Sequence, residues 1–197
     1  GSRPEVRAKL RAEYGLNDKL VVGCVARLMA QKNHTRLLDI FAALKKVRPD
    51  SCLLLVGEGE LRAELEAKAA RLGIAQDVKF LGVQSDTSIW YQAMDVFVMP
   101  SLFEGLPVVG MEASGLPCVF STGVTEEVLL RPDSCRISLE QPDEAWAAVL
   151  KDADRNLPDR AQAAAQVRAA GYDIRQETLR LQQLYTGLIA KRGAAHA

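Results

Sequence analysis

The 197-residue sequence lacks several features that mark particular classes of protein. It has only two histidines, and its four cysteines show no C-x-x-C spacing, so neither a zinc site nor dithiol chemistry is indicated. No apolar run approaches the roughly 20 residues that span a bilayer, and no signal peptide opens the chain. Lysine plus arginine equals aspartate plus glutamate at 25 each, so no overall field would hold nucleic acid. Any phosphate binding must therefore be local.

The cysteines are far apart in sequence, and most lie in apolar runs: Cys24, Cys52, Cys118 and Cys135. Four cysteines are too few for a disulfide framework in a chain of this length, so we interpret them as small buried apolar residues. This usage favours a reducing, cytoplasmic location.

Short apolar runs alternate with stretches of helical periodicity along the chain. Strands are predicted at residues 20–26, 52–56, 78–81, 96–99, 117–120 and, more faintly, 136–138. Helices are predicted at residues 34–47, 60–72 and 87–94, from residue 107 onward, and at 143–153, 158–170 and 174–191. The strands are nearly continuous apolar runs, which is typical of a parallel sheet buried on both faces. The fold class predicted is therefore α/β, a doubly wound, Rossmann-like parallel sheet with C-terminal helices.

The length fits one domain of ordinary size. We predict a Rossmann-like domain over residues 3–155, followed by C-terminal helices over 156–192. Gly1-Ser2 resembles the remnant of tag removal, which predicts a fragment that begins near Arg3.

Two glutamates, Glu104 and Glu112, bracket the segment that follows the predicted strand 96–99. Gly105 lets backbone approach a ligand closely, and Pro107 suits the first turn of a helix. A helix N-terminus at the carboxyl end of a strand binds anions, and a carboxylate about two turns further on can accept hydrogen bonds from a ribose diol. The pattern predicts a site for a phosphate attached to a sugar.

Loops after the other predicted strands also carry suitable residues. Arg27 and Lys32 follow the first strand, where their charges would neutralise a diphosphate, with Asn33 as the expected N-cap of the next helix. Gly57 follows the second strand, and Val83 lies where the chain would run along a flat base. The G-x-G-x-x-G fingerprint fails because position 62 is arginine, which argues against a dehydrogenase.

Each feature also has a purely structural interpretation. A glutamate pair at one spacing arises by chance, single cations are often surface charges, and the glycine turns are also common strand endings. His34 is most simply part of a helix start, and Asp152 and Asp154 are most simply a solvated face.

Taken together, the motifs resemble a known family. The segments Val25-Ala26-Arg27-Leu28 with Gln31-Lys32-Asn33-His34, Leu55 to Gly59, Val78 to Gly82 and Met94 to Pro107 are similar to the donor-binding half of the retaining GT-B glycosyltransferases of family 4, also called group 1. The likeness runs from about Pro4 to Tyr185.

The resemblance implies roles for individual positions. Arg27 and Lys32 would hold the donor diphosphate, and Glu104 would lie near the donor sugar; these three are the candidate catalytic residues. Glu112 would bind the ribose, and the remaining donor contacts would come from Gly57, Val83, Gly105, Leu106, Pro107 and Val108. The resemblance further implies metal-independent transfer with retention of configuration and no cofactor. The expected donor is a nucleoside-diphosphate sugar, with UDP preferred.

The sequence departs from the family pattern in length. The stretch from Glu112 to Gly115 is two residues shorter than usual, so either the helix ends early or residues are missing. Only the second of the two GT-B domains is present, so we expect the acceptor, a glycan or lipid-linked sugar, to bind through an absent N-terminal domain. The fragment alone is then expected to be inactive, and the whole enzyme to work at the inner face of a bacterial membrane in surface-polysaccharide synthesis. The alternative is a nucleotide-binding regulatory or assembly module without transfer activity.

Overall fold

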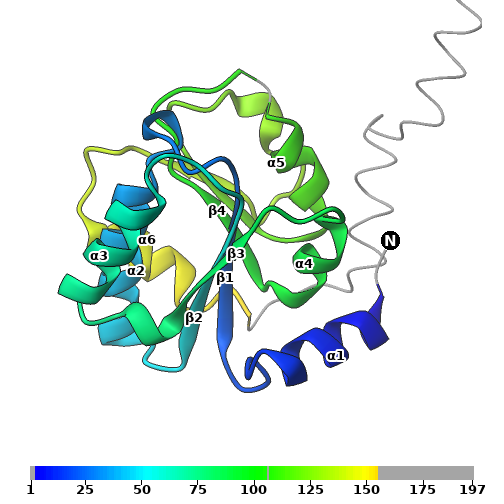
Figure 1. The fold of residues 1–197 in the computed structure, drawn as a ribbon. Helices are drawn as coiled ribbons and strands as arrows, with labels where there is room; N and C mark the ends of the chain where they lie inside the picture. Colours follow the sequence, from blue (N-terminus) through cyan, green and yellow to red (C-terminus); the bar gives the residue numbers. More distant parts are fainter. Residues whose placement is uncertain (1–2, 106, 155–197) are drawn as a thin grey trace, which may run out of the picture.

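A single parallel sheet organises the chain in the computed structural model, which describes residues 3–105 and 107–154 (Figure 1). Its six strands are, in chain order, β1 (Leu20–Val25), β2 (Ser51–Val56), β3 (Val78–Gly82), β4 (Val96–Met99), β5 (Cys118–Ser121) and β6 (Cys135–Ile137). The spatial order is β3-β2-β1-β4-β5-β6, and every neighbouring pair is parallel. The predicted doubly wound, Rossmann-like fold is therefore confirmed.

Helices cover both faces of the sheet (Figure 1). They are α1 (Pro4–Glu13), α2 (His34–Val47), α3 (Arg62–Arg71), α4 (Ser88–Ala93), α5 (Val108–Glu112) and α6 (Asp143–Leu150). Short 3-10 turns lie at η1 (Ala30–Lys32), η2 (Ala75–Asp77), η3 (Ala113–Gly115) and η4 (Glu126–Val128). The predicted helices 158–170 and 174–191, and with them the region 156–192, lie outside the described residues.

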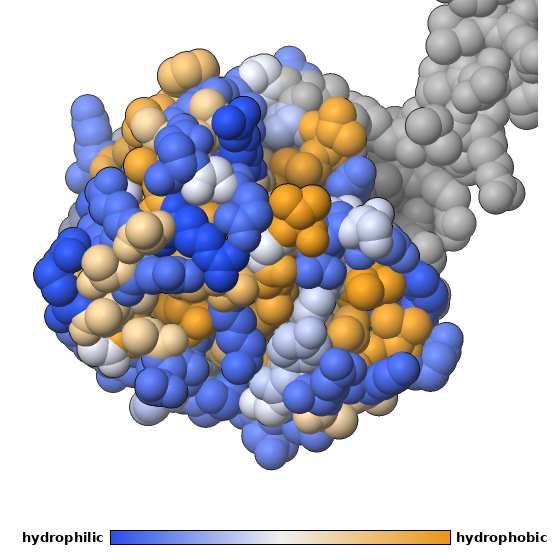
Figure 2. Space-filling model, in the orientation of Figure 1, coloured by the Kyte–Doolittle hydropathy of each residue, from blue (hydrophilic) through white to orange (hydrophobic). Residues whose placement is uncertain are grey.

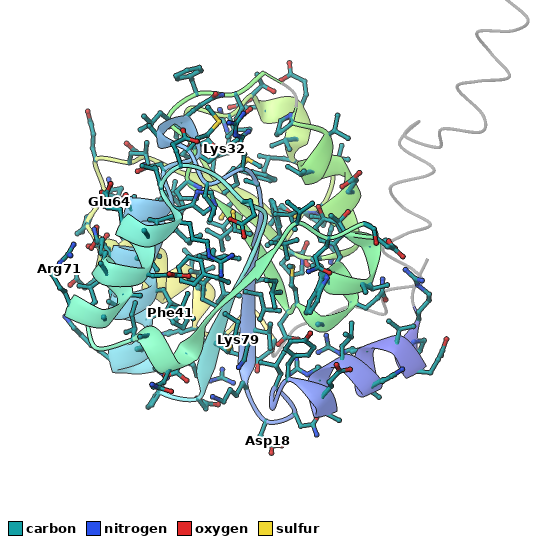
Figure 3. All side chains as sticks on the ribbon, viewed as in Figure 1. Asp18, Lys32, Phe41, Glu64, Arg71 and Lys79 are labelled. Carbon is teal, nitrogen blue, oxygen red and sulfur yellow. The ribbon has the colours of Figure 1, made fainter. Side chains whose placement is uncertain are left out.

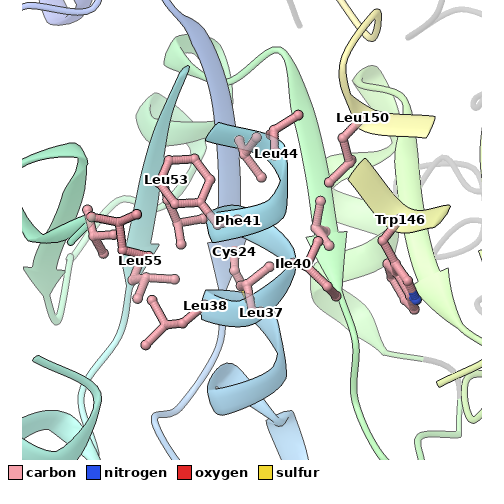
Figure 4. Packing of buried hydrophobic residues seen from close by; sticks show 14 of the residues in the cluster. Cys24, Leu37, Leu38, Ile40, Phe41, Leu44, Leu53, Leu55, Trp146 and Leu150 are labelled. Atoms are coloured by element: carbon pink, nitrogen blue, oxygen red, sulfur yellow. The ribbon is translucent and has the colours of Figure 1, made fainter. Parts of the chain in front are cut away.

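The face under α2, α3 and α6 carries one core cluster. Phe41 and Leu37 project from α2 at helical spacing, and Trp146 of α6 packs beside them; all three are almost fully buried (Figure 4). α2 begins and ends where its apolar periodicity and the following Pro49 predict. Because both faces are covered, strands β1, β2, β4 and β5 are buried throughout their length.

The helices α1 and α4 lie on the opposite face of the sheet. Of these two, α1 was not predicted from the sequence. Its sequence is mostly polar, but Pro4 occupies a first-turn position and Leu10 reaches the core cluster on this face. Arg11 anchors the helix by a 3.0 Å ion pair with the buried Asp95, which also accepts a hydrogen bond from the backbone N–H of Val21 at 2.9 Å. α1 is therefore fastened to the sheet through charge as well as apolar packing.

The segment after β4 forms less helix than predicted. α5 spans only Val108–Glu112, directly after Pro107, and continues as the 3-10 turn η3. Glu112 is thus the last residue of a five-residue helix, and the expectation that it lies two turns inside was wrong. The helix thus ends early, which is one of the two possibilities stated for the short stretch before Gly115. A Cβ on Gly110 would come within 2.5 Å of Val128, so this glycine lets α5 pack closely on η4.

No helix among the described residues is long and apolar enough to cross a membrane. On the face shown in Figure 2, hydrophilic and apolar side chains are mixed.

Candidate functional site

The strand order places the candidate site at the junction of β1 and β4. The chain leaves β1 toward β2 on one side and leaves β4 toward β5 on the other, so its direction switches between these two neighbouring strands at the carboxyl edge of the sheet. Ligands of open α/β sheets bind at such a switch in direction. Lys32 comes from the loop after β1 and Glu104 from the loop after β4. Figure 3 shows Lys32 at this edge of the sheet.

Lys32 and Glu104 are in direct contact. The Lys32 ammonium donates to Oε1 of Glu104 as an ion pair, and the two side chains are only 18% and 11% exposed. Lys32 ends the η1 turn, and the following Asn33 adopts a left-handed conformation with φ 56°. An ion pair screened from solvent interacts more strongly than one on the open surface. The structure therefore brings together two candidate residues that are 72 positions apart in the sequence.

Gln31 joins the same contact, and the sequence interpretation did not single it out. Its side-chain Nε2 donates to the carbonyl of Phe103 at 3.0 Å and lies 3.4 Å from Oε1 of Glu104. The backbone carbonyl of Gln31 accepts a hydrogen bond from the N–H of Leu102 at 2.8 Å. The only sequence signal for Gln31 as a site residue was its polar side chain directly before Lys32. Whether that side chain points toward Glu104 depends on the path of the loop.

Asn33 also links the two loops. It stands at the N-cap position of α2, as predicted, but its side chain makes no capping hydrogen bond there. Instead its amide donates to the carbonyl of Pro100 at 3.1 Å. The prediction of a side-chain cap was wrong because the left-handed backbone turns Asn33 toward the loop after β4.

The far side of Glu104 is held by the loop after β5. The N–H of Glu104 donates to the carbonyl of Gly123 at 2.9 Å, and Thr125 Oγ1 lies 3.4 Å from the carbonyl of Gly105. A Cβ on Gly123 would lie 2.2 Å from the carbonyl oxygen of Leu102, so only glycine permits this approach. Glu104 is thus fixed between two neighbouring loops.

Arg27 lies apart from this contact. Its side chain is 70% exposed, and its guanidinium is 3.8 Å from Glu60, which is itself 58% exposed. In the described part of the chain Arg27 pairs with Glu60, whereas Glu104 pairs with Lys32. A pair this exposed contributes about 0–1 kcal/mol to stability, so Arg27 is free to turn toward a ligand.

Glu112 is held from the α4 side. The hydroxyl of Tyr91 donates to Oε2 of Glu112 at 3.2 Å, while Glu112 itself is exposed. Burial raises the pKa of Tyr91, and the charge and hydrogen bond of Glu112 raise it further, so the phenol stays a donor. Tyr91 was not predicted as part of the site, because only its position on the inner side of α4 brings it to α5.

The candidate residues at the ends of β2 and β3 have different surroundings. Gly57 has φ 137°, and a Cβ there would lie 2.1 Å from the carbonyl oxygen of Ala26. Its N–H donates to the carbonyl of Gly82 at 2.9 Å. The close approach that the glycine allows is therefore to the loop after β1. Val83, which directly follows Gly82 at the end of β3, is 78% exposed.

In the segment that opens α5, Gly105 and Val108 are exposed and Pro107 is buried. Leu106 lies outside the described residues. Gly105, Pro107 and Val108 follow Glu104 in the chain, in the loop after β4 and at the start of α5.

Other polar residues named in the sequence analysis contact neighbouring side chains of the domain. His34 is buried, with Nε2 3.7 Å from the sulfur of Cys24, and burial together with the charge of Lys32 lowers its pKa to about 4. Asp154 pairs with Arg48 at 2.7 Å, so it anchors the end of α6 and is not simply a solvated charge. Over residues 3–105 and 107–154, no group of three or more potential metal ligands comes together. The four cysteines are free, and three of them are buried.

Comparisons with known proteins agree with this architecture. The chain is 39% identical over 176 residues to EpsF of Bacillus subtilis, covering 85% of this chain and 45% of EpsF. It is 29% identical to the lipopolysaccharide core biosynthesis mannosyltransferase LpsB of Rhizobium meliloti, covering 94% of this chain and 57% of LpsB. The solved structure of Anabaena HepE in complex with UDP and glucose superposes with a TM-score of 0.78 at 22% identity, over 94% of this chain and 53% of HepE.

The fold and the residues at the β1/β4 junction define a Rossmann-like α/β domain with a polar site at its carboxyl edge. A sequence profile of one family, glycosyl transferases group 1, matches residues 6–170. The chain belongs to that family, as its motifs predicted. It spans about half the length of the curated relatives named above.

Proposed function

We propose that this chain is the donor-binding half of a retaining glycosyltransferase. The whole enzyme would transfer a hexose-type sugar from a nucleoside-diphosphate donor, preferably a UDP-sugar, to a glycan or lipid-linked acceptor. The observation that carries the proposal is the shielded Lys32–Glu104 contact at the β1/β4 junction, where a cation and a carboxylate meet beside the segment that opens α5. The fold-level likeness to HepE, solved with UDP and glucose, supports the choice of donor.

The proposed roles follow from charge and position. Lys32 and Arg27 neutralise the diphosphate, which lowers the cost of its departure as a leaving group. The backbone N–H groups of Gly105, Leu106 and Val108 donate to phosphate oxygens, whereas Pro107 has no N–H to donate. Glu104 accepts from a hydroxyl of the donor sugar.

The nucleoside would extend away from these charges. Glu112 accepts from the ribose hydroxyls, and Val83 offers an exposed apolar surface beside the base. Gly57 contributes indirectly, by allowing the loop that carries Arg27 to pack against the end of β2.

The acceptor and the setting of the whole enzyme are also proposals. LpsB carries lipopolysaccharide core biosynthesis in its name, which supports a lipid-linked glycan acceptor and surface-polysaccharide synthesis for this chain as well. Such an acceptor would bring the whole enzyme, as a peripheral protein, to the inner face of the membrane. Because the chain spans about half of EpsF and LpsB, we expect it to bind donor without transferring sugar by itself.

Calorimetric titration with UDP, GDP and ADP tests the proposal. We expect one of them to bind, and Lys32→Ala to weaken binding about tenfold at low salt and less at high salt, because the lost interaction is between charges. Glu112→Gln should weaken the same nucleotide about threefold to tenfold through the ribose contact. Chelation with EDTA should leave binding unchanged if the site uses no metal. Glu66→Gln, an exposed change on α3, is the matched control and should bind like the wild type.

Failure of all three nucleotides to bind would refute the proposal, and it would equally contradict the nucleotide-binding regulatory or assembly module. Robust sugar transfer by this chain alone would contradict the expectation that it is inactive.

A further inference from the structure

Gln31 is the one side chain that contacts both the backbone and the carboxylate of the Glu104 loop in the described part of the chain. Its Nε2 donates to the carbonyl of Phe103 at 3.0 Å and lies 3.4 Å from Oε1 of Glu104. In addition, the backbone carbonyl of Gln31 accepts a hydrogen bond from the N–H of Leu102 at 2.8 Å. Gln31 thereby ties three consecutive residues after β4 to the loop after β1.

These contacts give the carboxylate of Glu104 a direction. Lys32 and Gln31 both approach Oε1, and the other oxygen, Oε2, has no hydrogen-bond partner within residues 3–105 and 107–154. A carboxylate anchored through one oxygen presents the other as an acceptor. The partner that an acceptor at this position fits is a hydroxyl group.

The role of Gln31 becomes larger when a diphosphate binds. A diphosphate carries more negative charge than one carboxylate, so it competes with Glu104 for the ammonium of Lys32. Gln31 is neutral and its amide donors are directed at Phe103 and Glu104, so it does not follow the diphosphate. It then remains as the side-chain donor that keeps Oε1 in place.

We propose that Gln31 is a positioning residue that aims the carboxylate of Glu104 at a hydroxyl of the donor sugar. This inference rests on the proposed function, since it assumes that a sugar nucleotide occupies the site. Gln31 then supports the part of the affinity that comes from the sugar, and it leaves the part that comes from the nucleotide nearly unchanged.

Two substitutions separate positioning from simple loop stabilisation. Gln31→Met keeps the length of the side chain and removes both donor contacts. Gln31→Glu keeps the shape but places a second carboxylate against Glu104, which repels it. The matched control is Ser121→Ala, because the Ser121 hydroxyl donates to the carbonyl of Ser101 in the same loop without contacting Glu104.

The readout is the ratio of the dissociation constants of UDP and UDP-glucose, measured by calorimetry at pH 7.5 with GDP and GDP-mannose in parallel. The Glu104→Ala variant serves as the reference in which the contribution of the sugar to the affinity is lost completely. We expect Gln31→Met to reduce the preference for the sugar nucleotide about threefold to tenfold while the affinity for the free diphosphate changes less than about twofold. Gln31→Glu should reduce the preference further, and Ser121→Ala should preserve it.

The outcomes are distinguishable. If the wild type binds none of the four ligands, the proposed function fails and this inference fails with it. If the wild type prefers the sugar nucleotide and Glu104→Ala abolishes that preference while Gln31→Met retains it, only the role of Gln31 is refuted. Equal weakening of the free diphosphate and the sugar nucleotide in Gln31→Met would also refute it, because that result is the signature of loop disruption.

Discussion

His34 makes the stability of this domain depend on pH in a window set by one buried imidazole. The residue is the first of α2 and is 1% exposed, and its Nδ1 has no hydrogen-bond partner in the described part of the structure. Burial, assisted by the nearby charge of Lys32, lowers its pKa from 6.5 to about 4. The folded protein therefore resists protonation of this ring.

The direction and the size of the change in stability with pH follow from the difference between the folded and unfolded pKa values of His34. Because the folded pKa lies below the unfolded one, the stabilisation is complete above about pH 6.5 and is lost as the pH falls toward 4. Between pH 7.5 and pH 5, the two pKa values correspond to a loss of about 2 kcal/mol in the free energy of unfolding. That is a substantial share of the roughly 5–15 kcal/mol typical of a domain.

Urea unfolding followed by circular dichroism at pH 7.5 and pH 5 measures this loss. We expect His34→Leu, which keeps an apolar side chain of similar size, to reduce the loss to less than about 0.5 kcal/mol. His196→Ala removes the other histidine of the sequence and should behave like the wild type. Asp50 does not titrate between pH 7.5 and pH 5, because the hydrogen bond from Arg48 lowers the pKa of its carboxyl group. Equal losses in the wild type and His34→Leu would refute the reasoning.

Three further predictions follow from the contacts of the site. Gly57→Ala should lower the free energy of unfolding by about 3 kcal/mol in the same urea assay, since its Cβ would clash with the carbonyl of Ala26; a change below about 0.5 kcal/mol would contradict this. Tyr91→Phe should weaken nucleoside-diphosphate binding about twofold to fivefold by releasing Glu112, and unchanged calorimetric affinity would show that the hydrogen bond does not matter for binding. Arg27→Gln should leave stability within about 0.5 kcal/mol because its side chain is 70% exposed, yet weaken nucleotide binding more at low than at high salt. The same affinity and the same salt dependence as in the wild type would remove Arg27 from the site.

The sheet and its larger helices were predictable because their signals are local. The boundaries of α2 follow from the spacing of Leu37 and Phe41 and from the stop at Pro49. The polar helix α1 escaped prediction because its anchoring depends on Asp95, more than 80 positions away in sequence. α5 is shorter than predicted, since it ends at Glu112 and continues as the 3-10 turn η3.

The site was predictable to the level of loops but not of side-chain directions. The rule that ligands bind at the carboxyl edge of a parallel sheet places Lys32 and Glu104 at the same edge, but their contact depends on β1 and β4 being neighbours, which was not predicted. It does not say that Arg27 turns toward Glu60 or that Gln31 turns toward Glu104. Those directions depend on the path of each loop, which is set by contacts between residues far apart in the chain.

The hydrogen bonds that join Gln31 and Asn33 to the segment after β4 have a consequence for binding thermodynamics. Loops that are already fastened to each other in the free protein lose little conformational freedom when a ligand arrives. Association should then show a heat-capacity change no larger than the apolar area of the ligand interface requires, without the additional contribution that accompanies coupled folding. This edge of the sheet would act as a rigid receptor whose selectivity is established when the polypeptide folds.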